Sequence, residues 1–386
     1  MTSLTSSIPL VILFLAVCST LYHLAVALAA LRFRSKGQPD YYPFAPPVSV
    51  LKPLRGIEQN FYASLATFFR QDYPDFEIVF GLNDDGDAAR WTIAQLQRDF
   101  PNVPVKIVTV SESDSLHAAN PKMSKLDRML TEASHDIVVL SDADIRVAPD
   151  YLRRVVRPLA DDGIGLVTCL YRGIPAKPFL SILEALGMSG DFAGQVLLAR
   201  MIQGIRFGLG ATMATRKRQI AQIGGIAKWA DYLADDYILG REIAATGHRI
   251  HLSSAVVETV LPRRTALQTF HQQLRWARTI RACSPAGYPG LLFVFGVPLA
   301  LAILALEPHS AEALVTLAAV LIARFLSAFA AGIVVCRDRV LARYFWLLPL
   351  RDLFALGIWV LSFFGREVVW RDARFRLEPG GKIKPI

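Results

Sequence analysis

The sequence is poor in charged residues and in cysteine. Only 19% of its 386 residues are Asp, Glu, Lys or Arg, and its four cysteines lie far apart, with no CxxC pair among them. These scarcities argue against a small disulfide-bonded scaffold and a cysteine zinc site, and the high apolar content argues against a disordered chain. The chain also lacks GxGxxG after its first expected strand and lacks GxxxxGK[ST], so neither a dinucleotide-binding Rossmann site nor a P-loop is supported.

Apolar residues are abundant, at 53% with a mean hydropathy of +0.35, and they concentrate at the two ends. Residues 8–31 carry no charge and would form a helix of about 36 Å, longer than the roughly 30 Å core of a bilayer. Arg32, Arg34 and Lys36 follow directly, which predicts that the chain enters the cytoplasm there. Because the leader lacks a basic region, we expect a transmembrane anchor rather than a cleaved signal peptide.

The C-terminal region, residues 286–365, is expected to hold two or three membrane segments. Residues 286–306 and 313–335 are apolar, and the loop between them has no Lys or Arg, as is typical of an outer loop. Arg324 lies inside the second run and needs a partner or a lipid headgroup. The run 344–365 has basic flanks on both sides, which favours a re-entrant segment over a full span, because a re-entrant segment keeps the basic tail 366–386 in the cytoplasm.

The net charge of +9 fits either binding to nucleic acid or a position at a membrane surface. After Cys336, basic residues are twice as numerous as acids, and they stand beside hydrophobic segments. This arrangement favours the cytoplasmic face of a membrane over nucleic acid as the partner. We therefore expect a multi-pass membrane protein, located in the inner membrane if the source is bacterial, with a cytoplasmic central domain.

Residues 48–284 form that central domain and alternate between strand-like and helix-like segments. The expected strands cover residues 48–51, 77–82, 105–110, 136–140 and 165–170, and the expected helices include 62–70, 91–99 and 122–133. This alternation predicts βαβ units and an α/β fold with a mostly parallel sheet. Ligands of such sheets bind outside the carboxyl ends of the strands, so acids that follow strands are candidate site residues.

Two acidic clusters follow expected strands. The first, residues 83–87, follows strand 77–82 and also fits an ordinary polar turn. The second contains Asp142 and Asp144 after strand 136–140. In an extended chain, residues two apart point the same way, so these two carboxylates are expected to bind one Mg²⁺ or Mn²⁺ together with substrate phosphates. An N-cap of the next helix would explain only one of them.

Two further motifs come later in the chain. Asp235 and Asp236 fit either the start of a helix, where acids favour the macrodipole, or a general base in a partly apolar pocket. The string Gln272-Gln273-Leu274-Arg275-Trp276 stands in an expected helix with several arginines. An amphipathic interfacial helix accounts for the arginines but not for the ordered QxxRW string.

The order N-D, D-x-D, D-D and Q-x-x-R-W resembles membrane glycosyltransferases with the GT-A nucleotide-sugar fold. Among these, the chain is most similar to the ceramide glucosyltransferases of glycosyltransferase family 21, whose bacterial branch glycosylates hopanoids. The resemblance includes the strings VLKPLRG at 50–56, DYP at 72–74, NPK at 120–122 and IRV at 145–147. It covers residues 48–284 and also the tail string RDARFRL that begins at Arg371.

The resemblance implies a role for each matching residue. Asp84 contacts the uridine end of the donor, Asp142 and Asp144 are the D-x-D pair that binds the donor and the metal, and Asp236 is the catalytic base. Gln272, Arg275 and Trp276 are the donor-binding QxxRW residues. The chain also departs from the animal enzymes, which have D-S-G in place of Asp142-Ala143-Asp144 and histidine in place of Gly190.

The expected function is inverting transfer of a sugar from a UDP-sugar to a hydroxyl of a membrane lipid, most closely ceramide. Alternatives are a hopanoid acceptor, a processive polysaccharide synthase and a membrane sugar-binding protein without catalysis. A synthase needs a channel, for which three or four segments are too few. The sequence does not choose the sugar, the lipid acceptor among ceramide, hopanoid and glycerolipid, or the oligomeric state.

Overall fold

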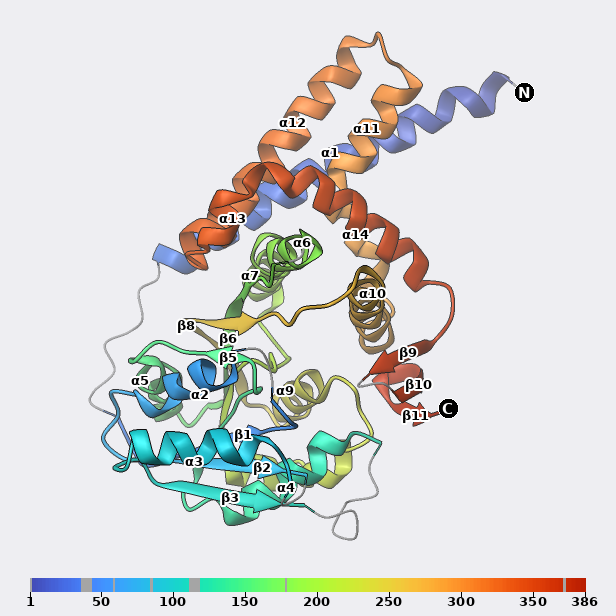
Figure 1. The fold of residues 1–386 in the computed structure, drawn as a ribbon. Helices are drawn as coiled ribbons and strands as arrows, with labels where there is room; N and C mark the ends of the chain where they lie inside the picture. The colour runs from blue at the N-terminus through green and yellow to red at the C-terminus, as the bar shows by residue number, and fades with distance from the viewer. Residues whose placement is uncertain are drawn as a thin grey trace. The chain divides into compact units, whose positions relative to one another are not determined.

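The computed structural model describes residues 2–35, 44–57, 60–83, 86–110, 119–177, 179–370 and 373–386, with the backbone alone for residues 2–7 and 35. The chain forms two compact units. The helical unit comprises residues 1–37, 177–203 and 264–374, and the sheet unit comprises residues 38–176, 204–263 and 375–386. Both units are therefore built from segments that are far apart in the sequence (Figure 1).

A mixed sheet dominates the sheet unit. Within the described ranges it has eight strands in the order β3-β2-β1-β4-β7-β6-β8-β5. The pairs β3-β2, β2-β1, β1-β4 and β6-β8 are parallel, and β4-β7, β7-β6 and β8-β5 are antiparallel. The strands are β1 Val48–Pro53, β2 Phe76–Leu82, β3 Val105–Thr109, β4 Ile137–Leu140, β5 Ile145–Arg146, β6 Ile164–Ile174, β7 Met213–Arg216 and β8 Arg249–Val260.

The five expected strands all form, and they run in one common direction in the sheet, as the alternation predicts. The antiparallel pairs come from two short strands that were not expected: β7, four residues long, inserts between β4 and β6, and β5, two residues long, pairs with β8. So short a strand has too few residues to show an alternating pattern in the sequence. The α/β fold class is confirmed, with a sheet more mixed than expected.

Helices cover this sheet, and one of them depends on a glycine. Side chains of α2, α3 and α5 join one apolar core with the strands. Helix α4 packs where Gly81 of β2 has no side chain, because a Cβ there would lie 2.4 Å from the sulfur of Met129. The helices of this unit are α2 Phe61–Phe69, α3 Ala89–Asp99, α4 Pro121–Glu132, α5 Tyr151–Val156, α8 Lys217–Gln222 and α9 Asp235–Ala245.

The end of the chain belongs to the sheet unit. Strand β10 (Ala373–Leu377) pairs antiparallel with β11 (Ile383–Pro385). The amide of Ile383 donates to the carbonyl of Asp231 at 2.8 Å, and Lys382 forms an isolated bridge with Tyr232. The tail thus holds the loop that immediately precedes α9.

The helical unit contains the candidate membrane helices. Three helical stretches within the described residues are long and apolar enough to cross a membrane, Ile8–Arg34, Ala311–Val335 and Phe345–Ser362. A fourth span exists if Tyr288–Val294 and Gly296–Leu306, bent by 64°, count as one. The elements of this unit are α1 Thr2–Ser35, α6 Phe179–Gly187, α7 Ala193–Gln203, α10 Ala266–Cys283, α11 Gly296–Leu306, α12 Ala311–Ala328, α13 Arg339–Arg343, α14 Leu348–Ser362 and β9 Glu367–Trp370.

Arg324 of α12 has protein partners rather than a lipid headgroup. Its side chain is 1% exposed, its Nε donates to Asp352 of α14 at 2.9 Å, and its Nη1 donates to the carbonyl of Gly190 at 3.1 Å. Its Nη2 bonds to Asp191, which lies in the π-helical turn Met188–Phe192 between α6 and α7. A buried charge is stable in an apolar setting only when it is paired in this way.

The expected segment boundaries differ from the compact units. Residues 177–203 and 264–284 lie inside the expected domain 48–284 but cluster with the terminal helices. The run 286–306 is a short helix with a bent entry, and Phe345–Ser362 has the length and composition of a span. The boundaries 8–31, 48–284, 286–365 and 366–386, and the choice between a re-entrant and a spanning segment at 344–365, stay predictions.

Candidate functional site

The structure describes all but one of the expected site residues. Asp84 lies outside the described residues. The acids of the sheet unit are Asp142, Asp144 and Asp236, and the QxxRW residues Gln272, Arg275 and Trp276 lie on α10 of the helical unit. The two groups belong to different compact units, so their convergence on one site stays a prediction.

Asp142 and Asp144 follow β4, whose four residues are all buried. The carbonyl of Asp142 accepts from the amide of Ile145 at 3.4 Å, and the carbonyl of Asp144 accepts from the amide of Val260 at 2.9 Å. The next helix, α5, begins at Tyr151, after Asp150. Neither acid of the pair is therefore an N-cap, which removes the simplest structural explanation for them.

The buried side chain of Lys52 supports the turn that carries Asp142. Its side chain is fully buried, with Nζ 4.0 Å from the ring centroid of Phe68. The ammonium donates to the carbonyl oxygen of Asp142 and lies 3.4 Å from Ser141 Oγ. A buried lysine needs such partners to remain charged. Lys52 therefore fixes the backbone that presents the Asp142 carboxylate.

Lys122 joins two of the acidic motifs. Its Nζ lies 2.7 Å from Asp142 Oδ1 and 2.9 Å from Asp235 Oδ2. Burial disfavours the ammonium, but the two carboxylates outweigh this effect and hold the pKa of Lys122 above its ordinary value. Asn120, the N-cap of α4, positions Lys122 by accepting from its amide at 3.0 Å. The sequence places Lys122 in an NPK string but assigns it no role.

Asp236 lies at the start of α9 with both carboxylate oxygens held by backbone amides. Oδ2 accepts from Gly210 N and Oδ1 from Tyr237 N, each at 2.7 Å. Burial and the neighbouring Asp235 raise the pKa of Asp236 to about 6, while the amide hydrogen bonds and Lys122 act in the opposite direction. A carboxylate with this pKa can accept a proton near neutral pH.

At Gly210 the expected base, Asp236, lies near the expected metal-binding acid, Asp142. A Cβ built on Gly210 would lie 3.1 Å from Asp142 Oδ2 and 3.3 Å from Asp236 Oδ2. The two carboxylates thus face the same point, and glycine leaves that point open. The loop is held against α9 because Gly208 N donates to the Asp236 carbonyl at 3.1 Å. Sequence inspection passes over this loop, although its Gly-Leu-Gly string marks a close backbone approach.

Tyr171 of β6 lies among the same acids. Burial raises the pKa of its hydroxyl, and the carboxylates of Asp236, Asp142 and Asp144 raise it further. The Tyr171 hydroxyl therefore stays protonated near neutral pH.

The described residues contain no group of three or more His, Cys, Asp or Glu placed to hold a metal ion. The two carboxylates Asp142 and Asp144 nonetheless suit Mg²⁺ or Mn²⁺, because such ions commonly take one or two protein carboxylates and complete their shell with substrate phosphates and water. The side chain of Asp142 is 40% exposed and accessible to a ligand. The donor set fits a divalent ion that arrives with its substrate.

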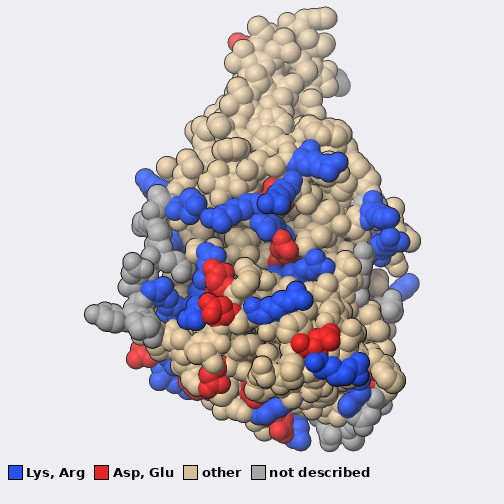
Figure 2. All heavy atoms as spheres, turned by 60° about the vertical axis from the view of Figure 1, so that its left-hand side comes forward, with Lys and Arg blue, Asp and Glu red and all other residues tan. Residues whose placement is uncertain are grey.

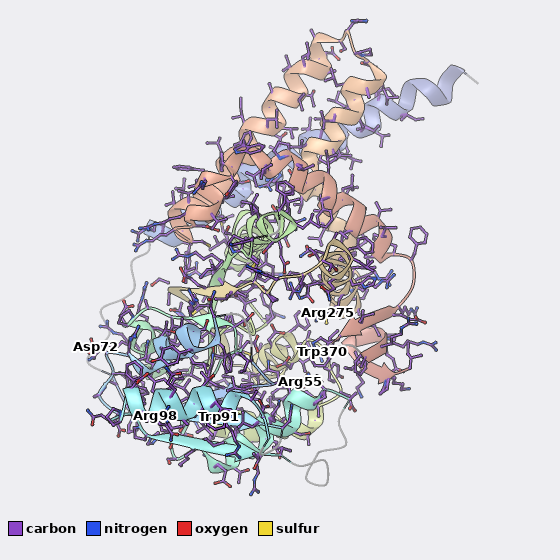
Figure 3. The ribbon with its side chains drawn as sticks, viewed as in Figure 1. Arg55, Asp72, Trp91, Arg98, Arg275 and Trp370 are labelled. Carbon is purple, nitrogen blue, oxygen red and sulfur yellow. The ribbon has the colours of Figure 1, made fainter. Side chains whose placement is uncertain are left out.

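Helix α10 uses its arginines in different ways. Arg278 donates to the carbonyls of Phe364 and Glu367, and Arg281 donates to the carbonyl of Gly365 at 2.7 Å. These two side chains bind the backbone that follows α14 and do not simply form a basic face. Burial raises the pKa of Glu184 on α6, and its ion pair with Arg264 at 3.0 Å, followed by Arg351 and Arg275, acts in the opposite direction. Arg275 is labelled on α10 in Figure 3.

Comparisons with known proteins agree with the motifs. A family model described as glycosyl transferase family 21 matches residues 9–383. Ceramide glucosyltransferase 1 of Caenorhabditis elegans is 25% identical over 71% of this chain and 58% of its own length. Ceramide glucosyltransferase 3 of the same organism is 26% identical over 61% of this chain and 51% of its length. The chain thus spans little more than half the length of these curated relatives.

A solved structure shares the fold. A mannosyltransferase from Pyrobaculum calidifontis, in complex with GDP-Man and Mn²⁺, superposes with a TM-score of 0.50 at 22% identity. The match covers 92% of this chain and 99% of that structure. The expected GT-A fold and the expected family resemblance are both confirmed.

Proposed function

Because the chain belongs to glycosyl transferase family 21, we propose that it transfers a sugar from a UDP-sugar to the hydroxyl of a membrane lipid, with inversion at the anomeric carbon. Ceramide is the first candidate acceptor, because the curated relatives are named ceramide glucosyltransferases. The three candidate membrane helices suit an acceptor whose tails stay in the bilayer.

The approach of Asp142 and Asp236 across Gly210 carries this proposal. The geometry suits a reaction in which a base must lie beside a bound diphosphate. Asp236 Oδ accepts the hydroxyl proton of the lipid, and the hydroxyl oxygen forms the new bond to the anomeric carbon. The bond from that carbon to the diphosphate oxygen breaks, and UDP leaves with the electron pair. Attack from the side opposite the leaving group inverts the configuration and gives a β-glycoside.

The leaving diphosphate and the carboxylates beside it need positively charged partners. Mg²⁺ or Mn²⁺, held by Asp144 with Asp142, would neutralise charge that grows on the leaving diphosphate. Lys122 keeps Asp142 oriented and separates its charge from that of Asp235. Arg275 of the QxxRW string, with Gln272 and Trp276, is proposed to bind the donor, and Asp84 its uridine.

A substrate panel tests the proposal. The purified full chain is incubated with UDP-glucose, UDP-galactose or UDP-N-acetylglucosamine and with ceramide, a hopanoid polyol or diacylglycerol, and products are identified by mass spectrometry. We expect one sugar per lipid and a loss of product when EDTA removes divalent ions. A polymeric product would indicate a polysaccharide synthase. Donor binding without transfer to any acceptor would indicate a sugar-binding protein.

Two substitutions test the site itself. Asp236→Asn should lower kcat by about two to four orders of magnitude, as expected for loss of a general base, while UDP binding stays near normal. Gly210→Ala should also lower kcat, because the new methyl group would occupy the point that both carboxylates face. Gly357→Ala is the matched control, since nothing lies within 4 Å of a Cβ there. Near-normal turnover in Asp236→Asn would exclude Asp236 as the base.

A further inference from the structure

One end of the helical unit carries six arginines that the proposed reaction does not use. They lie in the last turn of α1, near the end of α7, and in and just before α13. We call them the basic belt: Arg32, Arg34, Arg200, Arg337, Arg339 and Arg343.

Contacts between helices place two parts of the basic belt at one level. Helices α1 and α12 run side by side in the same direction, since Ser19 and Val320 both flank Gly296 and His23 bonds to Ser327 at 2.9 Å. An α-helix advances about 1.5 Å per residue, and the π-helical segment Phe329–Val335 that continues α12 advances somewhat less. Nine residues from His23 and nine from Ser327 therefore bring Arg32 within about one turn of Cys336 and Arg337 along the helix axes.

Helix α7 brings Arg200 to the same end. The guanidinium carbon of Arg200 lies 5.0 Å from the ring centroid of Phe33, and Arg32 Nη1 lies 3.8 Å from the sulfur of Met201. The last turns of α1 and α7 are thus in contact. Arg200 is only partly exposed, whereas the other five arginines are exposed.

Acids do not neutralise the basic belt from within its own segments. In residues 8–34, 193–203 and 335–347 the sole acid is Asp338, whose side chain is buried. Asp338 accepts from the amides of Val340 and Leu341 and from the hydroxyl of Ser189. Its carboxylate therefore caps α13, and these segments carry six arginines against one acid.

The surroundings of the basic belt are apolar. Leu31, Ile202 and Trp346 are 53%, 72% and 70% exposed. Exposed aliphatic and tryptophan side chains beside arginines are typical of protein that meets lipid headgroups. The opposite ends of α11 and α12 carry Glu307 and Glu312 and no Lys or Arg, and that projecting part is tan almost throughout in Figure 2.

We propose that the basic belt binds the phosphate groups of acidic phospholipids. Guanidinium groups pair with phosphate through two parallel hydrogen bonds, and several arginines at one level can engage several headgroups together. A neutral lipid such as phosphatidylcholine also carries a phosphate, but its choline cation offsets the attraction. The inference does not depend on the proposed transfer reaction, because none of the six arginines is assigned a role in it.

The test compares lipids on the full chain purified in detergent. The thermal midpoint is measured with phosphatidylglycerol, phosphatidylcholine or inorganic phosphate, and native mass spectrometry counts the retained lipids. We expect phosphatidylglycerol to raise the midpoint and to be retained, with phosphatidylcholine and phosphate much weaker. If inorganic phosphate raised the thermal midpoint as much as phosphatidylglycerol did, the basic belt would bind free phosphate and the proposed phospholipid site would be wrong.

Matched variants locate the site. Arg337→Gln/Arg339→Gln/Arg343→Gln should weaken phosphatidylglycerol binding by at least about tenfold, since each arginine near an anionic surface contributes about fivefold. Arg32→Gln/Arg34→Gln should weaken it less and serves if the triple variant folds poorly. The control, Arg98→Gln/Arg128→Gln/Arg218→Gln, removes equal charge from exposed positions of the sheet unit. Equal retention by the triple variant and the control would refute the proposal.

Discussion

At the scale of single residues, the site depends on the groups that bind three carboxylates, those of Asp142, Asp235 and Asp236. Asp142 and Asp235 share the ammonium of Lys122, whereas Asp236 is held by the amides of Gly210 and Tyr237. Asp236 has no cation in hydrogen-bond contact among the described residues, and burial raises its pKa.

This difference predicts a pH dependence. Burial and then Asp235 raise the pKa of Asp236 to about 6, and only the ionised form can accept a proton. We expect kcat/KM for the lipid acceptor to be constant above that pH and to fall about tenfold per unit below it. Asp235→Asn should move this acidic limb to lower pH, because it removes a neighbouring negative charge. A limb that stays in place would show that another group controls it.

At the scale of elements, α10 anchors the end of α14. The backbone carbonyls that follow a helix need hydrogen-bond partners, and arginine side chains can supply them. Arg278 and Arg281, one turn apart, donate to the carbonyls of Phe364, Gly365 and Glu367. The helix that carries the QxxRW string thus has a structural use, through Arg278 and Arg281, that the string itself does not reveal.

Removing this anchor should loosen the end of α14. Arg278→Ala is expected to destabilise the segment by about 1.5–3 kcal/mol, the range for hydrogen bonds that involve a charged group. Hydrogen exchange at the amides of residues 363–370 should then become faster. Arg263→Ala, an exposed arginine before the same helix, is the control. Unchanged exchange in Arg278→Ala would mean that the contacts do not stabilise the segment.

At the scale of the whole molecule, buried charges join helices that are distant in sequence. Arg324 of α12 binds Asp352 of α14 and Asp191 of the turn between α6 and α7. Arg351 lies 3.5 Å from the second oxygen of Asp191. The network fixes how the turn between α6 and α7 packs against α12 and α14, which belong to candidate membrane helices.

The network predicts a non-additive pair of substitutions. Arg324→Leu should lower stability by about 3–5 kcal/mol, because it leaves buried carboxylates without their cation. Adding Asp352→Leu should restore part of the loss, since Asp191 retains Arg351. Thermal midpoints in detergent measure both, with Arg263→Leu as an exposed control. A double variant as unstable as the sum of the two single variants would contradict this account.

The sequence alone determined the local chemistry of this protein. Apolar runs predicted candidate membrane helices because a bilayer demands continuous hydrophobic length, and strand-helix alternation predicted the parallel half of the sheet. The ordered motifs indicated the family, since several residue strings in one order rarely coincide by chance. Asp142 and Asp144 stood out because they follow an expected buried strand, and the family resemblance singled out Asp236; the roles of all three stay predictions.

Only the tertiary structure decided which groups meet. Lys122 contacts Asp142 and Asp235, and the open point at Gly210 faces two carboxylates, because segments from 20 to more than 100 residues apart in the sequence come together after the carboxyl end of β4. The same holds for Arg324, whose partners lie on other helices. Pairings of this kind depend on packing over the whole chain, and no local pattern of residues encodes them.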